Sequence, residues 1–171
     1  MMLAMLAPVP AEILADGFKV ENPSGLVAFG TGEPSEDNSG AWSFEFFSKE
    51  EFVEGKGNLP VLIYGSSSGL KASHSFYHTG FVTAVGVYER TTAAKSWKHP
   101  DSSLRPKFAL ESDTKWTMFW EVSKLRPLAK KNHIPLSKLK LPGIGKLKSY
   151  SGAPPRGPML VVVPDEFIDM L

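Results

Sequence analysis

The sequence contains no cysteine, and this absence excludes several functions that are common among small domains. Without a thiol there is no disulfide, no cysteine nucleophile, and no zinc knuckle or iron–sulfur cluster. Long apolar runs are also missing, since none approaches the roughly 18 to 20 residues that a membrane-spanning helix needs. We therefore expect a protein without a membrane segment that resides in a reducing compartment, the cytoplasm.

The N-terminal segment is apolar, but it lacks the basic start of a signal peptide. It carries Pro8 and Pro10 within a stretch that is too short to cross a membrane. We interpret residues 1–16 as an N-terminal arm, either packed or frayed, of a single domain that covers residues 1–171. The length of 171 residues and the hydrophobic content of 42% suit one domain with a sizeable core.

Glycine and proline are frequent, with 15 and 14 residues, and this composition is typical of short strands joined by turns. The apolar runs at residues 59–64 and 80–88 are rich in β-branched and aromatic residues and predict strands. Further strands are expected at residues 25–29, 115–122 and 159–163. Short helices are predicted at residues 49–55, where Ser48 and Glu51 form a capping box, at residues 136–140, and after Pro164.

Side chains alternate in the strand predicted at residues 115–122. One face carries Trp116, Met118, Trp120 and Val122, and the other carries Lys115, Thr117, Phe119 and Glu121. This period predicts a single core face, with Trp116 and Trp120 buried in it. Strands interrupted by single helices predict an α+β fold, a small mixed curved β-barrel with two or three short helices packed around it.

Basic charge is concentrated in one segment, although the net charge of the whole chain is only +1. Between residues 121 and 157 the only acidic residue is Glu121, and the basic residues are Lys124, Arg126, Lys130, Lys131, Lys138, Lys140, Lys146, Lys148 and Arg156. A clustered basic surface attracts polyanions and releases their counterions, whereas a solvated lysine-rich face serves mainly solubility. Both interpretations stay open. The expected phosphate ligands are Lys140, Lys146, Lys148 and Arg156, together with Lys98.

The basic segment includes a glycine-rich loop. Residues 141–146 read Leu-Pro-Gly-Ile-Gly-Lys and resemble the turn of a helix-hairpin-helix DNA-binding element, in which glycine N–H groups approach a phosphate. Residues 149–158 do not suit the second helix of that element. We retain a loop that contacts phosphate through its glycines and Lys146, with an ordinary turn as the alternative.

Two other patterns lack the context that their chemistry requires. Residues 65–69 match G-x-S-x-G around Ser67, but a nucleophile elbow needs a following helix, and none is predicted. His74 and His78 have i, i+4 spacing, but their segment has no helical period, and no acidic residue lies near them. We expect no catalytic set, metal or cofactor, and we keep a small serine hydrolase using Ser67 as the alternative from another class.

Two tryptophans lie where core residues are not expected. Trp42 follows a polar loop, and Trp97 lies in the basic stretch Lys-Ser-Trp-Lys-His at residues 95–99. Exposed large aromatic side chains are typical of binding sites. A nucleobase stacked on an aromatic side chain gains roughly 1 to 3 kcal/mol, and a methyl group on the base adds apolar surface. Two separately packed surface tryptophans are the alternative.

The order of these features resembles the YTH/EVE group of PUA-like domains, which read modified nucleobases. The resemblance spans residues 25–167. Its motifs are Trp42 before a short helix, the strand at 59–64, Val85-Gly86-Val87, the Trp97 loop ending in Arg105-Pro106-Lys107-Phe108, Arg126-Pro127-Leu128 and Ile134-Pro135-Leu136. It implies an aromatic cage whose walls are Trp42 and Trp97. Tyr77 is a candidate third wall, in competition with Phe108 and Leu110, and Asn22 and Ser43 are candidates for reading the base edge.

The resemblance also implies a biological setting. In bacteria and archaea such domains resemble the N-terminal specificity modules of McrBC-type modification-dependent restriction systems, whose motor and nuclease reside elsewhere. We therefore expect a non-catalytic reader of N6-methyladenine in DNA, which takes the base out of the stack. A reader of RNA or of 5-methylcytosine on the same fold is the alternative. The expected partners are methylated DNA, further domains of a longer chain with an NTPase motor, and a nuclease subunit.

Overall fold

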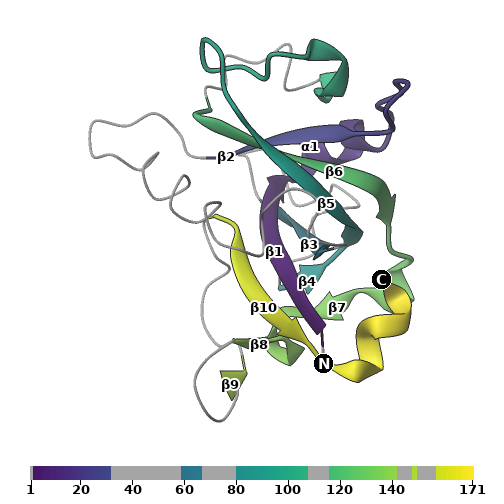
Figure 1. Cartoon of the computed structure of the whole chain (residues 1–171). Helices are drawn as coiled ribbons and strands as arrows, with labels where there is room; N and C mark the ends of the chain where they lie inside the picture. The colour runs from purple at the N-terminus through teal and green to yellow at the C-terminus, as the bar shows by residue number, and fades with distance from the viewer. Residues whose placement is uncertain (1, 32–58, 67–79, 108–115, 142–147, 150–156) are drawn as a thin grey trace.

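The computed structural model describes residues 2–31, 59–66, 80–107, 116–141, 148–149 and 157–171, and an eight-stranded mixed sheet is its central feature (Figure 1). The strand order is β2–β6–β5–β3–β1–β10–β8–β9. The strands are β1 (Met2–Pro10), β2 (Val27–Thr31), β3 (Leu59–Ser66), β5 (Ala84–Ala93), β6 (Met118–Pro127), β8 (Lys140–Leu141), β9 (Lys148–Ser149) and β10 (Met159–Val163). A second, two-stranded sheet pairs β4 (Phe81–Val82) with β7 (Ile134–Pro135).

Helical structure is sparse in the described residues. The one α-helix among them is α1 (Ala11–Gly17), and the 3₁₀ helices are Ser102–Leu104, Lys130–Asn132, Leu136–Lys138 and Asp165–Met170. This mixture of many strands and a few short helices confirms the α+β class. Within the described part, β2 and β9 form the two edges of the sheet, so the sheet is not closed into a barrel there.

Most predicted elements are present. The predicted strands correspond to β2, β3, β4 with β5, β6 and β10, and the predicted helices near residues 136 and 165 are 3₁₀ helices. The helix predicted at residues 49–55 lies outside the described residues. No helix in the described ranges is both long enough and apolar enough to cross a membrane.

The N-terminal segment differs from the arm that its sequence suggested, because residues 2–10 form a strand in the middle of the sheet. This strand, β1, pairs antiparallel with β10 and parallel with β3. The pairing with β10 ends at Leu6, so Pro8 and Pro10 lie where β1 pairs with β3 alone. Proline has no N–H to donate, and it is tolerated in a strand where one side has no partner strand. Apolar and polar side chains do not alternate along β1 because both of its faces are covered, as is typical of buried strands.

Successive residues of the central strands enter two different cores. Met5 and Val61 pack in one cluster with Trp120, whereas Leu6 and Leu62 pack in another with Val161. In the first cluster the rings of Phe29 and Trp120 lie with centroids 5.0 Å apart. The sheet is therefore buried on both faces along its middle, which gives it a rigid frame for the loops at its ends.

The prediction of a single core face for β6 was wrong in one respect. Met118, Trp120 and Val122 do face the core, as predicted, but Phe119 and Glu121 on the other face are also buried. Phe119 packs with Ala28 and Leu104 in a third small cluster. The alternation of residue types could not show this, because the cover over the second face comes from the loop that follows β5.

Two bulges interrupt the pairing of β5 with β6, and the second restores the register that the first shifts. Val85 pairs with Arg126 but Val87 pairs with Ser123, so β6 carries one extra residue there, and Lys124 has a left-handed φ of 51°. Gly86 is required at this point, because a Cβ on it would lie 2.4 Å from the side chain of Val122. Further along, β5 carries the extra residue Glu89, which restores the first register. Bulges of this kind change which side chains oppose each other.

Candidate functional site

A tight hairpin turn follows β5 and presents Trp97. The backbone N–H of Lys95 donates to the carbonyl of Lys98 at 2.8 Å, and the N–H of Lys98 donates back at 3.1 Å. The two central residues are both left-handed, with φ of 51° at Ser96 and 64° at Trp97. A two-residue hairpin loop with two positive φ values is a type I′ turn, for which Asn-Gly is the preferred sequence.

The residues in this turn are unfavourable for its backbone. A left-handed conformation costs an L residue roughly 1–2 kcal/mol, and a bulky side chain such as that of Trp97 is seldom found there. The indole is not buried in return, since Trp97 is 46% exposed and is the one exposed large hydrophobic residue in the described ranges. Strain of this kind persists only when the surroundings hold it, and it is concentrated at functional sites.

Trp116 holds the turn from the side of β6. Its backbone N–H donates to the carbonyl oxygen of Trp97 at 3.1 Å, and Ala94 donates in the same way to Thr117. The indole of Trp116 lies directly over Gly30 of β2, where a Cβ would come within 2.3 Å of the ring. Trp116 is half-buried and precedes β6, so it supports the hairpin. The prediction that it is buried in the main core was wrong.

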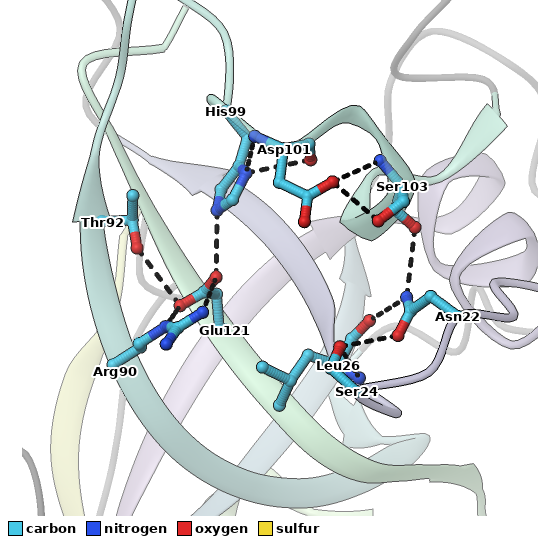
Figure 2. Close-up of polar contacts among 9 residues, drawn as sticks. All are labelled: Asn22, Ser24, Leu26, Arg90, Thr92, His99, Asp101, Ser103 and Glu121. Carbon is cyan, nitrogen blue, oxygen red and sulfur yellow. Dashed lines mark hydrogen bonds and ion pairs between the residues drawn. The ribbon is translucent and has the colours of Figure 1, made fainter.

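A buried carboxylate of β6 holds the residue that follows the turn. His99 directly follows the hairpin and is buried, and its Nε2 lies 3.0 Å from Oε1 of Glu121, which has no exposed surface (Figure 2). Nδ1 of His99 lies 2.9 Å from the backbone nitrogen of Asp101 and 3.0 Å from its carbonyl oxygen. Because an ionised carboxylate only accepts hydrogen bonds, the contact with Glu121 requires a proton on Nε2. His99 therefore donates to Glu121 and connects the loop to the sheet.

Arg90 and Thr92 of β5 complete the surroundings of the carboxylate. Arg90 donates from Nε to Oε2 of Glu121 and from Nη2 to Oε1, the latter at 3.3 Å, and Thr92 donates to Oε2 at 3.2 Å. Each oxygen of Glu121 thus accepts two hydrogen bonds, the full capacity of a carboxylate. The buried carboxylate therefore has all of its hydrogen bonds, and removing one partner is expected to lower the free energy of unfolding.

The remainder of the loop is held by short-range polar contacts. Asp101 accepts from the backbone N–H of Ser103 at 2.9 Å and from its hydroxyl at 2.6 Å, and these hydrogen bonds lower the pKa of the Asp101 carboxyl below its ordinary value. Asn22 donates from its amide to the carbonyls of Leu26 and Ser103 (Figure 2). The loop after β5 is therefore tied to the segment before β2 as well as to the sheet.

Phe119 lies beneath this loop. The ring of His99 meets it edge-on with centroids 5.3 Å apart, and the guanidinium of Arg105 lies over it at 5.9 Å. Arg105 is buried, and its burial lowers its pKa from the ordinary value. The ring of Phe119 and the buried guanidinium of Arg105 thus pack against the inner side of the loop. The side chain of Trp97, on the other hand, is exposed.

The structure brings some predicted site residues together and separates others. Trp97 and Lys98 adjoin in the hairpin and are both exposed. Asn22, predicted to read a base edge, bonds to Ser103 of the same loop and accepts a hydrogen bond from Ser24. Lys140 and Lys148 belong to β8 and β9, at the opposite end of the molecule from the loop after β5 (Figure 1).

Several predictions fall on residues outside the described part of the chain. These are Trp42, Ser43, Tyr77, Lys146 and Arg156 of the predicted binding site, the competing residues Phe108 and Leu110, and Ser67, His74 and His78 of the enzyme and metal alternatives. Within the described ranges, no group of three or more His, Cys, Asp or Glu side chains is arranged to hold a metal ion.

Sequence reasoning missed the buried polar cluster. Glu121 was predicted on the polar face of its strand, and His99 and Arg90 were not predicted as its partners. One signal was available in the sequence, because Glu121 is the single acidic residue in a run of apolar and basic residues from 116 to 164. An isolated carboxylate in such a run indicates a specific partner.

Comparison of the chain with protein-family models, with curated proteins and with solved structures gave no match.

Proposed function

We propose that this chain is a non-catalytic reader of a modified nucleobase, N6-methyladenine in DNA, and that Trp97 is one wall of the cage that receives the flipped base. In this proposal Trp42 supplies the opposite wall, and the sheet belongs to a PUA-like barrel of the YTH/EVE type. The domain would direct a modification-dependent restriction system whose motor and nuclease lie in other domains or subunits.

The presentation of Trp97 is the observation that carries the proposal. An indole that is 46% exposed on a left-handed backbone gains little from folding. The turn is nevertheless held at two points, by the backbone of Trp116 and through His99 by Glu121. An ordered, exposed aromatic face suits stacking on a flat ligand, because little side-chain freedom remains to be lost on binding.

The charge around the indole favours a nucleotide over an uncharged flat ligand. Lys95 and Lys98 are directly opposed across the hairpin, so their side chains leave the same face, and both are exposed. Two ammonium groups beside an aromatic surface can contact the phosphates on either side of a stacked base. Four further lysines of the basic segment, Lys124, Lys130, Lys131 and Lys138, are also exposed.

Binding of the purified chain to matched duplexes tests the proposal. The duplexes carry no mark, N6-methyladenine or 5-methylcytosine, with RNA versions of each in parallel. Trp97→Ala is expected to lose roughly 5- to 150-fold in affinity for the marked site, equivalent to about 1–3 kcal/mol of stacking. Binding to the unmarked duplex is expected to change little, since phosphate contacts supply it.

Trp120→Ala is the matched control, because its indole is 1% exposed and lies in the core. That change is expected to lower the free energy of unfolding by about 3–5 kcal/mol, with the ratio of marked to unmarked affinity unchanged for the folded protein. Trp42→Ala is expected to resemble Trp97→Ala. If Trp97→Ala keeps the wild-type ratio, Trp97 does not contact the base. Preference for an RNA or for 5-methylcytosine would identify the alternative reader.

A further inference from the structure

The turn at Ser96 and Trp97 cannot keep its left-handed backbone conformation without contacts to other residues. Ser96 and Trp97 are both left-handed, and their turn closes with the paired backbone bonds between Lys95 and Lys98. A backbone in this conformation relaxes unless neighbouring groups determine it. The segments on either side of the turn must therefore supply the restraint.

On the C-terminal side, the restraint passes through one side chain. His99 follows Lys98 directly, and its imidazole is enclosed by Glu121, Phe119 and the backbone of Asp101. The other donors to Glu121 are Arg90 and Thr92, which both belong to β5 (Figure 2). Among the described residues, three side chains donate to the carboxylate, and His99 alone of these comes from the loop.

The register of β5 against β6 orients Glu121 for its contact with His99. The bulge at Glu89 sets Arg90 opposite Glu121, so the buried carboxylate has a cationic partner within the sheet itself. Oε1 of Glu121, which also accepts from Nη2 of Arg90, lies 3.0 Å from Nε2 of His99 in the loop. A carboxylate fixed by two neighbours on its own sheet is a preorganised acceptor for a third.

We infer that His99 and Glu121 form a latch that fixes the hairpin at residues 95–98, and that both are positioning residues for Trp97. The latch is the hydrogen bond from Nε2 of His99 to Oε1 of Glu121. When it is closed, the hairpin keeps its left-handed turn and the indole is held toward solvent. When it is broken, the hairpin relaxes while the sheet, which is held by its own two cores, stays folded.

The latch itself does not depend on the ligand, whereas its importance for binding rests on the proposed function. Two conservative variants separate the two polar contacts of the ring. In His99→Gln the side-chain amide stands in for Nε2 and can still donate to Glu121. In His99→Asn the side-chain carbonyl stands in for Nδ1 and can still accept from Asp101, but the contact with Glu121 is lost.

Hydrogen exchange of the Lys95 and Lys98 amides in the full chain reports whether the turn is closed. His99→Asn is expected to accelerate exchange at both amides about tenfold or more, the factor that corresponds to one lost charge-assisted hydrogen bond. His99→Gln is expected to stay within about twofold of the wild type. The indole N–H resonance of Trp97, assigned by its loss in Trp97→Phe, is expected to shift in the Asn variant alone.

Tyr88→Phe is the control for a general loss of stability. It removes the hydrogen bond between Tyr88 and Thr91 on β5 and leaves His99 and Glu121 unchanged, so the exchange of Lys95 and Lys98 is expected to remain as in the wild type. Equal behaviour of His99→Gln and His99→Asn, or unchanged exchange in both, would overturn the latch. Acceleration in Tyr88→Phe equal to that in His99→Asn would overturn it as well.

Affinity for the marked duplex is measured on the same variants. Loss of affinity in His99→Asn and its retention in His99→Gln would connect the latch to binding. If no variant, wild type included, binds the duplex, the proposed function fails while the exchange data still decide the latch. If affinity falls in His99→Asn while the amides of Lys95 and Lys98 stay protected, the latch fails instead.

Discussion

Arg90 lies opposite Glu121 because the bulge at Glu89 shifts the pairing of β5 with β6 by one residue. Tyr88 pairs with Val122, and continuation of that register would set Glu89 against Glu121. The bulge instead sends Glu89 to the surface, where it accepts a hydrogen bond from Ser123, and gives the buried carboxylate a guanidinium. One inserted residue therefore replaces a repulsive pair by an attractive one.

The two glutamates should differ sharply when each is replaced by alanine. Glu121→Ala is expected to lower the free energy of unfolding by about 3–5 kcal/mol, because His99 keeps a buried N–H without an acceptor and Arg90 loses its anionic partner. Glu89→Ala is expected to change it by at most about 0.5 kcal/mol, since Glu89 is exposed. Urea denaturation of both variants checks this, and equal losses would contradict the assigned register.

Relief of strain in the hairpin should stabilise the protein. Ser96→Asn is expected to raise the free energy of unfolding by about 0.5–1 kcal/mol, because asparagine tolerates the left-handed conformation and is preferred at this position of a type I′ turn. Ser137→Asn serves as the control in a 3₁₀ helix, where no positive φ is present. A loss of stability in Ser96→Asn, measured by the same denaturation, would mean that the hydroxyl of Ser96 has a role of its own.

Gly30 is expected to be essential for the support of Trp97. In Gly30→Ala the new methyl group would overlap the indole of Trp116, so the ring must move and the bond from its backbone to Trp97 is strained. We expect a loss of about 1–3 kcal/mol in the free energy of unfolding. In a Trp116→Ala background the same change is expected to cost less than about 0.5 kcal/mol, and additive losses in the double-mutant cycle would rule out this contact.

Asp101 should make the stability of the loop depend on pH. Its hydrogen bonds with Ser103 lower the pKa of the carboxyl in the folded protein below the ordinary 3.8. A group whose pKa is depressed on folding contributes stability that is fully present above its unfolded pKa and is lost as the pH falls through the folded value. The thermal midpoint of the wild type should therefore approach that of Asp101→Asn below about pH 4 and exceed it near neutrality. A difference between the two proteins that does not change with pH would contradict this role.

The sequence was sufficient to predict the strands whose evidence is local. Residues 59–64 and 159–163 are short apolar runs bounded by turn residues, and both are strands. The exposure of Trp97 was also predictable, because the surrounding lysines and serine leave no apolar neighbours for the indole. Burial of apolar side chains and avoidance of buried charge act on each residue type in the same way wherever it occurs.

Tertiary structure decided the features that depend on pairing between distant segments. Whether residues 2–10 form an arm or a central strand depends on β3 and β10, which lie far away in the sequence. The burial of Glu121 depends on the bulge at Glu89 and on the cover supplied by His99, and neither leaves a periodic signal in the chain. The left-handed turn at Ser96 and Trp97 violates local preference, and the described contacts that hold it come from Trp116 and, through His99, from Glu121. Local patterns set which side chains seek burial, whereas register and loop contacts determine which partners they meet.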